Sequence, residues 1–75
     1  MARLRRISGR QAIGALERLG FVQVRQRGSH VVLKRQTPEG EVGCVVPLHS
    51  QLAIGTLRGI LKQARVARDA FMENL

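Results

Sequence analysis

The sequence predicts an α+β fold with the order α-β-β-β-α and a short extra helix at the C-terminal end. Three observations support this prediction: apolar residues recur at helical spacing near both ends, β-branched residues alternate in three segments between them, and turn-forming residues separate those segments. Consecutive strands flanked by helices form an antiparallel sheet with the helices packed on one face. We therefore expect a single domain over residues 1–75, in which residues 1–7 form a short basic extension.

The first helix is expected over residues 9–19. Ser8 is its predicted N-cap, because a serine hydroxyl accepts a hydrogen bond from the first helical turn. Apolar residues line one helical face: Ala12, Ile13, Ala15, Leu16 and Leu19. Gly20 ends the helix, since glycine readily adopts the left-handed conformation found there.

Three strands follow the first helix. The first spans residues 21–26 and the second spans residues 29–35, with a tight turn at Arg27-Gly28 between them. The acidic, turn-rich segment 36–41 is expected to form a longer hairpin loop. It leads to a third strand over residues 42–46.

Pro47 closes the third strand, because proline cannot donate a ladder hydrogen bond, and a loop around His49 leads to the second helix. Gly55 and Thr56 open this helix, with Thr56 as the predicted N-cap. Apolar residues mark the side expected to be buried: Leu57, Ile60, Leu61 and Ala64. Cations mark the other side: Arg58, Lys62 and Arg65. A short terminal helix should dock Phe71 on the core.

Length and composition exclude several classes of protein. A chain of 75 residues is too short for a large multidomain enzyme, and its 44% hydrophobic content argues against disorder. No apolar run exceeds five residues, so neither a transmembrane helix nor a signal peptide is expected. A single cysteine cannot form an internal disulfide, which favours a cytoplasmic chain. One cysteine and two histidines cannot supply a four-ligand zinc site, and we expect neither a metal nor another cofactor.

Positive charge is concentrated in the first half of the chain. The 13 Lys and Arg residues outnumber the five Asp and Glu residues, for a net charge of +8. Residues 1–35 carry this whole excess, whereas residues 36–75 have no net charge. The asymmetry is typical of a protein that binds a polyanion, and the predominance of arginine suits phosphate. An acidic protein partner or a merely solvated surface would account for the same charge, so both alternatives stay open.

His30 is the main candidate for chemistry. Helices on one side of a sheet leave its other face open, and strand alternation puts His30 and Val31 on opposite faces. Because both faces of this strand carry apolar residues, the sequence does not decide which of them is open. His30 nevertheless lies at the start of the strand, beside Arg25 and Arg27, where it should be accessible.

Cleavage of an RNA phosphodiester suits this setting. The reaction moves a proton off the 2′-hydroxyl or onto the leaving oxygen, while cations stabilise the phosphorane. An imidazole can exchange a proton at neutral pH, so we predict His30 as a general acid or base. The candidate RNA contacts are Arg25, Arg27, Gly28, Ser29, Lys34 and Arg35, with Arg58 and Lys62 as outlying ones. A lone histidine in a strand is also commonly structural, and this alternative is kept.

The other reactive side chains are weaker candidates. His49 is interpreted as a second acid or base, a substrate contact, or a loop residue bonded to the backbone. Cys44 lies in mid-strand and should belong to the core, and the five acids form no carboxylate pair for glycosidase or two-metal chemistry. Phe21 and Phe71 are the only aromatic residues, so structured RNA is a better expected ligand than a stacked single strand.

Four segments of the chain resemble a known family: Leu19–Phe21, Arg25–His30, Val46–His49 and Gly55–Ala64. In this order and spacing they are similar to the HicA family of toxin ribonucleases, over residues 8–72. The most specific part of the likeness combines the glycine-serine-histidine turn with the glycine-threonine-leucine opening of the second helix.

The resemblance implies a fold like that of the double-stranded-RNA-binding domain and cleavage of messenger RNA, which blocks translation. It places the catalytic role on His30 and implies a HicB-type antitoxin that masks this histidine. We expect no membrane partner and no direct DNA binding by the toxin alone. Two other functions stay open: a non-catalytic RNA-binding module of the same fold, and a protein-interaction domain for an acidic partner.

Overall fold

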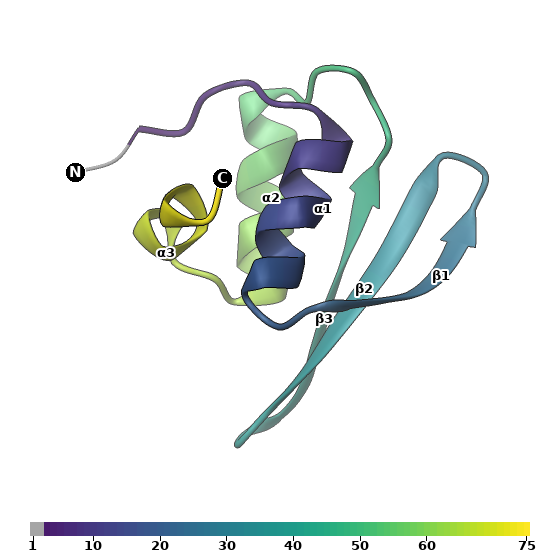
Figure 1. The fold of residues 1–75 in the computed structure, drawn as a ribbon, viewed down its shortest axis with the longest axis vertical. Helices are drawn as coiled ribbons and strands as arrows, with labels where there is room; N and C mark the ends of the chain where they lie inside the picture. The colour runs from purple at the N-terminus through teal and green to yellow at the C-terminus, as the bar shows by residue number, and fades with distance from the viewer. Residues whose placement is uncertain (1–2) are drawn as a thin grey trace.

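The computed structural model describes residues 3–75 and confirms the α+β architecture (Figure 1). The elements follow in the predicted order: α1 (Gly9–Arg18), β1 (Val22–Arg27), β2 (His30–Thr37), β3 (Gly40–Pro47), α2 (Ile54–Ala64) and α3 (Arg68–Glu73). The strands pair antiparallel in the order β1-β2-β3, so β2 is central and β1 and β3 form the edges. In Figure 1 the β2–β3 hairpin extends well beyond the helices. Within residues 3–75, no helix is long and apolar enough to span a membrane.

The helices pack on one face of the sheet, as predicted. Alternate residues of β2 and β3 are buried: Val31, Leu33, Val42, Cys44 and Val46. Each helix contributes a side chain that is fully buried in the same core: Leu16, Leu57 and Phe71. Intervening strand residues point to the opposite, open face, where Val45 is 40% exposed. The structure thus decides which face of β2 is open, a point that the sequence left undecided.

Capping residues at both ends of α1 confirm the predicted signals. Ser8 and Gln11 form a capping box: the Ser8 hydroxyl accepts from the Gln11 backbone N–H at 3.0 Å, and Gln11 Oε1 accepts from the Ser8 N–H at 2.9 Å. Beyond the helix, Gly20 has a φ of +99°. The Phe21 N–H donates to the Leu16 carbonyl and the Gly20 N–H to that of Glu17, which is the Schellman arrangement.

Both hairpin turns differ from the sequence-based prediction. The first turn consists of Gly28 and Ser29 rather than Arg27-Gly28, because Arg27 still pairs with His30 and the positive φ of +57° falls at Gly28.

The predicted loop over residues 36–41 is also wrong. β2 continues to Thr37 and β3 begins at Gly40, so only two residues connect the strands. The Thr37 hydroxyl donates to the Gly40 carbonyl at 2.6 Å, and Gln36 pairs with Glu41 across the hairpin. The polar, acidic composition of this segment reflects its exposure to solvent. Exposed residues can still pair as strands through their backbone hydrogen bonds.

The second helix begins earlier than predicted. α2 starts at Ile54 with Ala53 as its N-cap, and no side chain in the described part of the chain caps it, so the expectation that Thr56 is the N-cap is wrong. Ile54 packs partly buried against the core, and the Leu57 N–H donates to the Ala53 carbonyl at 3.0 Å. Packing rather than a cap residue therefore fixes this end. The predicted buried side is confirmed: Leu57, Ile60, Leu61 and Ala64.

The segment before α1 contributes to the core. Of the expected basic extension, residues 1 and 2 lie outside the described range. Leu4 and Ile7 are buried, and the Leu52 N–H donates to the Ile7 carbonyl at 2.6 Å. This segment therefore fastens the loop before α2 to the start of α1.

The first residue of α1 lies against the end of β3. The Gly9 N–H donates to the His49 carbonyl at 2.9 Å. A side chain on Gly9 would collide with the Pro47 carbonyl oxygen and reach 3.0 Å from the Leu48 Cα. Glycine is required here for the close approach of two backbones, and that approach sets where α1 sits on the sheet.

We expect Gly9→Ala to lower the free energy of unfolding by about 1–3 kcal/mol, because the collision is with backbone that cannot move aside. Gly59→Ala in α2 is the matched control, since a Cβ there meets nothing within 4 Å. Removing that helical glycine should be neutral or stabilise by up to about 1 kcal/mol. Urea unfolding of the two variants measures the difference, and equal stability of both would contradict the close-approach argument.

Candidate nucleic-acid interface

His30 lies on the open face, at the start of the central strand. Its neighbour Val31 is only 1% exposed and faces the helices, so alternation turns the imidazole to the opposite side. His30 is exposed, and within residues 3–75 its side chain has no hydrogen-bond or ion-pair partner. The ring is therefore accessible to a ligand that binds on the open face.

Two arginines of β1 share this end of the open face. Arg27 lies directly opposite His30 in the β1–β2 pairing, and Arg25 lies opposite Val32, two residues further along. Directly opposed residues on an antiparallel sheet have Cβ atoms roughly 5 Å apart. Both arginines are exposed. The arrangement therefore combines a proton carrier with two guanidinium groups that an anion can reach.

The turn before His30 is anchored on two sides. Gln26 Nε2 donates to the Gly28 carbonyl at 3.0 Å, and the Leu48 N–H donates to the Ser29 carbonyl at 2.7 Å. The second bond ties the turn to the segment that follows β3. His30 is consequently presented from a backbone that is held in place by neighbouring elements.

His49 lies at the same end of the sheet. It follows β3 by two residues, and Pro47, the last residue of β3, pairs with His30. The side chain of His49 is exposed, while its carbonyl accepts the Gly9 N–H. The His49 backbone therefore helps to position α1, while its side chain stays accessible, and the three predicted roles of this residue remain predictions.

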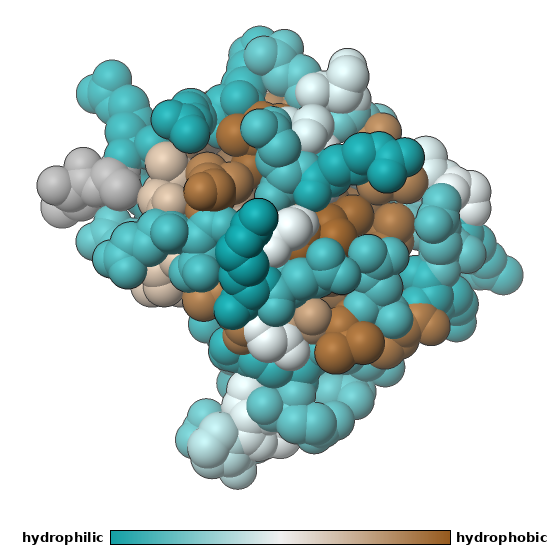
Figure 2. Space-filling model, in the orientation of Figure 1, coloured by the Kyte–Doolittle hydropathy of each residue, from teal (hydrophilic) through white to brown (hydrophobic). Residues whose placement is uncertain are grey.

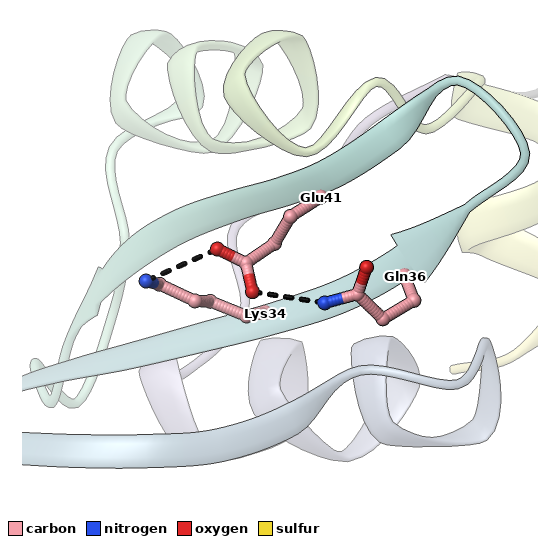
Figure 3. Close-up of polar contacts among 3 residues, drawn as sticks. All are labelled: Lys34, Gln36 and Glu41. Carbon is pink, nitrogen blue, oxygen red and sulfur yellow. Dashed lines mark hydrogen bonds and ion pairs between the residues drawn. The ribbon is translucent and has the colours of Figure 1, made fainter.

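Lys34 also lies on the open face but is engaged with a carboxylate. Its Nζ is 3.2 Å from Glu41 Oε1, and Glu41 Oε2 accepts from Gln36 Nε2 at 2.9 Å (Figure 3). Lys34 is four residues from His30 along the strand, or roughly 13 Å at the usual rise. Glu41 thus offsets part of the positive charge of Lys34, and this ion pair lies away from the end of the strand that carries His30.

Arg35 faces the helices rather than the open face. It donates from NH1 to the Leu19 carbonyl at 2.9 Å, and its guanidinium carbon lies 4.9 Å from the centroid of the Phe21 ring. Its Nε is buried and has no hydrogen-bond partner among residues 3–75. This guanidinium joins β2 to the segment between α1 and β1, and the structure does not bring it together with His30.

The outlying cations Arg58 and Lys62 are exposed on α2. Since α2 packs on the covered face of the sheet, these two residues belong to the opposite layer of the molecule from His30. Of the predicted RNA-contacting cations, only Arg25 and Arg27 lie immediately beside the histidine.

Cys44 is a core residue, as predicted, and is 3% exposed. Burial raises the pKa of its thiol to about 11, because a thiolate would lose its hydration there. Within residues 3–75, no three side chains of His, Cys, Asp or Glu come together as a metal site would require.

A trough between α1 and β1 was not predicted from the sequence. Its floor is apolar and consists of Ile13, Val31 and Leu48. Its sides are polar: Arg10 and Glu17 from α1, and Gln23 and Gln26 from β1. The volume is about 260 Å³, and Figure 2 shows hydrophobic surface exposed between hydrophilic side chains in this part of the molecule. The sequence carried one signal for the trough: two glutamines in the strand that neighbours the hydrophobic central strand.

The chain is similar to a known protein family. The family model described as the HicA toxin of bacterial toxin–antitoxin systems matches residues 9–66, which is most of the chain. The chain belongs to the HicA toxin family. The match runs from the first residue of α1 to just beyond α2 and includes the His30 turn, His49 and β1 with both arginines. No curated protein is similar enough to the chain to give a match.

The burial of Cys44 can be tested by its reactivity. We expect the native thiol to resist a disulfide reagent at pH 8 and to react fully once urea unfolds the chain. Because the folded pKa of about 11 exceeds the usual 9.0, folding should lose stability as the pH rises from 9 towards 11. Absorbance of the released thiolate measures the reaction, and rapid labelling of native protein would contradict the buried position.

Proposed function

We propose that this HicA toxin is an endoribonuclease that cleaves messenger RNA, with His30 as general acid or base. The observation that carries the proposal is the exposed imidazole of His30, which lies opposite Arg27 and beside Arg25 and has no side-chain partner within residues 3–75. Family membership supports the toxin role, and the chemistry of this cluster supports the reaction. We expect it to act in the cytoplasm, where its substrate is found.

In the proposed reaction the 2′-oxygen attacks the neighbouring phosphorus as the bond from phosphorus to the 5′-oxygen breaks. His30 takes the proton from the 2′-hydroxyl or supplies one to the leaving 5′-oxygen. Arg25 and Arg27 stabilise the extra negative charge on the phosphorane. The remaining proton transfer falls to solvent or to His49, which lies at the same end of the sheet.

The proposed protein partner is an acidic HicB-type antitoxin. Its supporting observations are the net charge of +8 and the valines exposed on the open face beyond His30, where Val22 is 62% and Val45 40% exposed. A partner that covers these valines and neutralises the arginines also covers the histidine. Inhibition by steric exclusion follows directly from that overlap.

His30→Ala should lower the rate of RNA cleavage by roughly 10²- to 10⁴-fold, the usual contribution of a general acid or base. The side chain is exposed, so the fold should persist. Cleavage of a structured RNA by purified protein measures the effect, together with growth and messenger-RNA integrity after induction in a host without antitoxin.

His49→Ala is the matched histidine control and should retain more activity than His30→Ala. Undiminished cleavage by a clean His30→Ala preparation would refute the catalytic assignment. Salt-sensitive RNA binding without any products from the wild type would instead establish the non-catalytic module.

Arg25→Ala and Arg27→Ala should each weaken RNA binding and reduce the slope of log affinity against log salt by roughly one, because each removes one phosphate contact. Arg68→Ala in α3 removes an exposed arginine of the helical layer and controls for net charge alone. Titration of a non-cleavable RNA at several salt concentrations gives the slopes. The same decrease in all three variants would mean that only overall charge matters.

A further inference from the structure

The α1–β1 trough begins where the His30 turn ends. Val31, in its floor, directly follows His30, and Leu48, also in the floor, binds the Ser29 carbonyl through its N–H. Gln26, at its side, holds the Gly28 carbonyl. His30 and the two arginines lie on the open face and the trough lies on the helix side of the same edge strand, so an RNA strand must cross the edge of the sheet at β1 to place a phosphate beside His30 and a neighbouring nucleotide in the trough.

A β-bulge aims both glutamines of β1 into the trough. Gln23 pairs with Leu33 and Gln26 pairs with Val31, and both of these partners are buried on the helix-facing side. Residues three apart normally point to opposite faces, but the register shift between Gln23 and Arg25 inserts one extra residue. All six residues of β1 are exposed, so the helices leave this side of the strand uncovered.

The unpaired polar atoms of the trough include several hydrogen-bond acceptors. Gln23 Nε2 donates to Glu17 Oε2 at 3.2 Å, and Gln26 Nε2 donates to the Gly28 carbonyl. Both amide orientations are fixed because each partner is an acceptor. Within residues 3–75, three acceptors are left without a partner: Gln23 Oε1, Gln26 Oε1 and Glu17 Oε1.

We propose that the α1–β1 trough is a nucleobase subsite that selects a base with an exocyclic amino group close to the scissile phosphate. This inference rests on the proposed ribonuclease function and adds to it a determinant of sequence preference. The apolar floor suits the face of a base, and the acceptors suit an amino group at its edge. Uracil has no amino group, and its one edge donor, the N3–H, is flanked by two carbonyl oxygens that meet the Glu17 carboxylate unfavourably.

The features of the trough favour a base over a protein side chain from the antitoxin. Its volume of about 260 Å³ is below that of a pocket for a drug-sized ligand, and its lining combines two glutamine amides from β1 with a carboxylate from α1. Arg10 adds a guanidinium at the α1 side, where it can stack on the base or bind its phosphate.

The direct test is titration of the full chain with 5′-AMP, 5′-CMP and 5′-UMP, which carry the same phosphate, while the side-chain amide NMR signals of Gln23 and Gln26 are followed. AMP and CMP should bind roughly 2- to 10-fold more tightly than UMP, the value of one hydrogen bond. The N6,N6-dimethyl derivative of AMP keeps the ring and phosphate but lacks the amino hydrogens, so it should bind as weakly as UMP.

Gln23→Leu should abolish the difference between AMP and UMP. Gln36→Leu is the matched control, because Gln36 is also a strand glutamine bonded to a glutamate, but it lies on the β2–β3 hairpin outside the trough (Figure 3). Equal affinity for all nucleotides, or the same shifts with ribose 5-phosphate, would overturn the proposal. So would a Gln23→Leu variant that keeps its base preference and loses only its affinity for an antitoxin.

The outcomes also separate this inference from the proposed function. If His30→Ala cleaves RNA like the wild type but the AMP preference is found, the catalytic assignment fails and the subsite stands. The opposite result is that His30→Ala is inactive and that RNAs are cleaved at the same rate whether or not uracil replaces a single base near the scissile phosphate. In that case the subsite fails and the ribonuclease assignment stands.

Discussion

The contact of Gly9 with the end of β3 is the constraint on which the rest of the site depends. Because no side chain intervenes, the start of α1 rests on Pro47 and Leu48, and the same two residues adjoin His30 and the turn before it. One junction therefore positions the helix that lines the trough, the loop with His49 and the first residue of the central strand. A larger distance between Gly9 and the end of β3 would displace the trough-lining helix from both His49 and His30.

Much of the fold follows from local chemistry that is visible in the sequence. The Ser8 cap, the left-handed Gly20 and the apolar spacing of both long helices act within a few residues, and each is found as expected. The errors arise where packing or pairing overrides such signals. Thr56 has the chemistry of a cap, but the helix starts at Ile54, which contacts the core.

The candidate site was predictable in its residues but not in its geometry. His30, Arg25 and Arg27 were identifiable as a histidine beside cations, yet their common face depends on which side of β2 the helices cover. Arg35 shows the limit most clearly, because its position in sequence resembles that of a phosphate contact while its guanidinium is used within the fold. The trough depends on a bulge in β1, and no single residue type announces a bulge.

The exposure of β1 on both faces has a consequence for the energetics of binding. An edge strand with few buried contacts opens at a lower free energy than the core, so its amide hydrogens should exchange before those of β2 and β3. The strand carries Arg25 and Arg27 on one face and Gln23 and Gln26 on the other. Local opening of β1 therefore withdraws the two arginines and the two glutamines from their faces of the sheet in one cooperative step. A ligand that stabilises the closed strand gains contacts with both pairs of side chains at once.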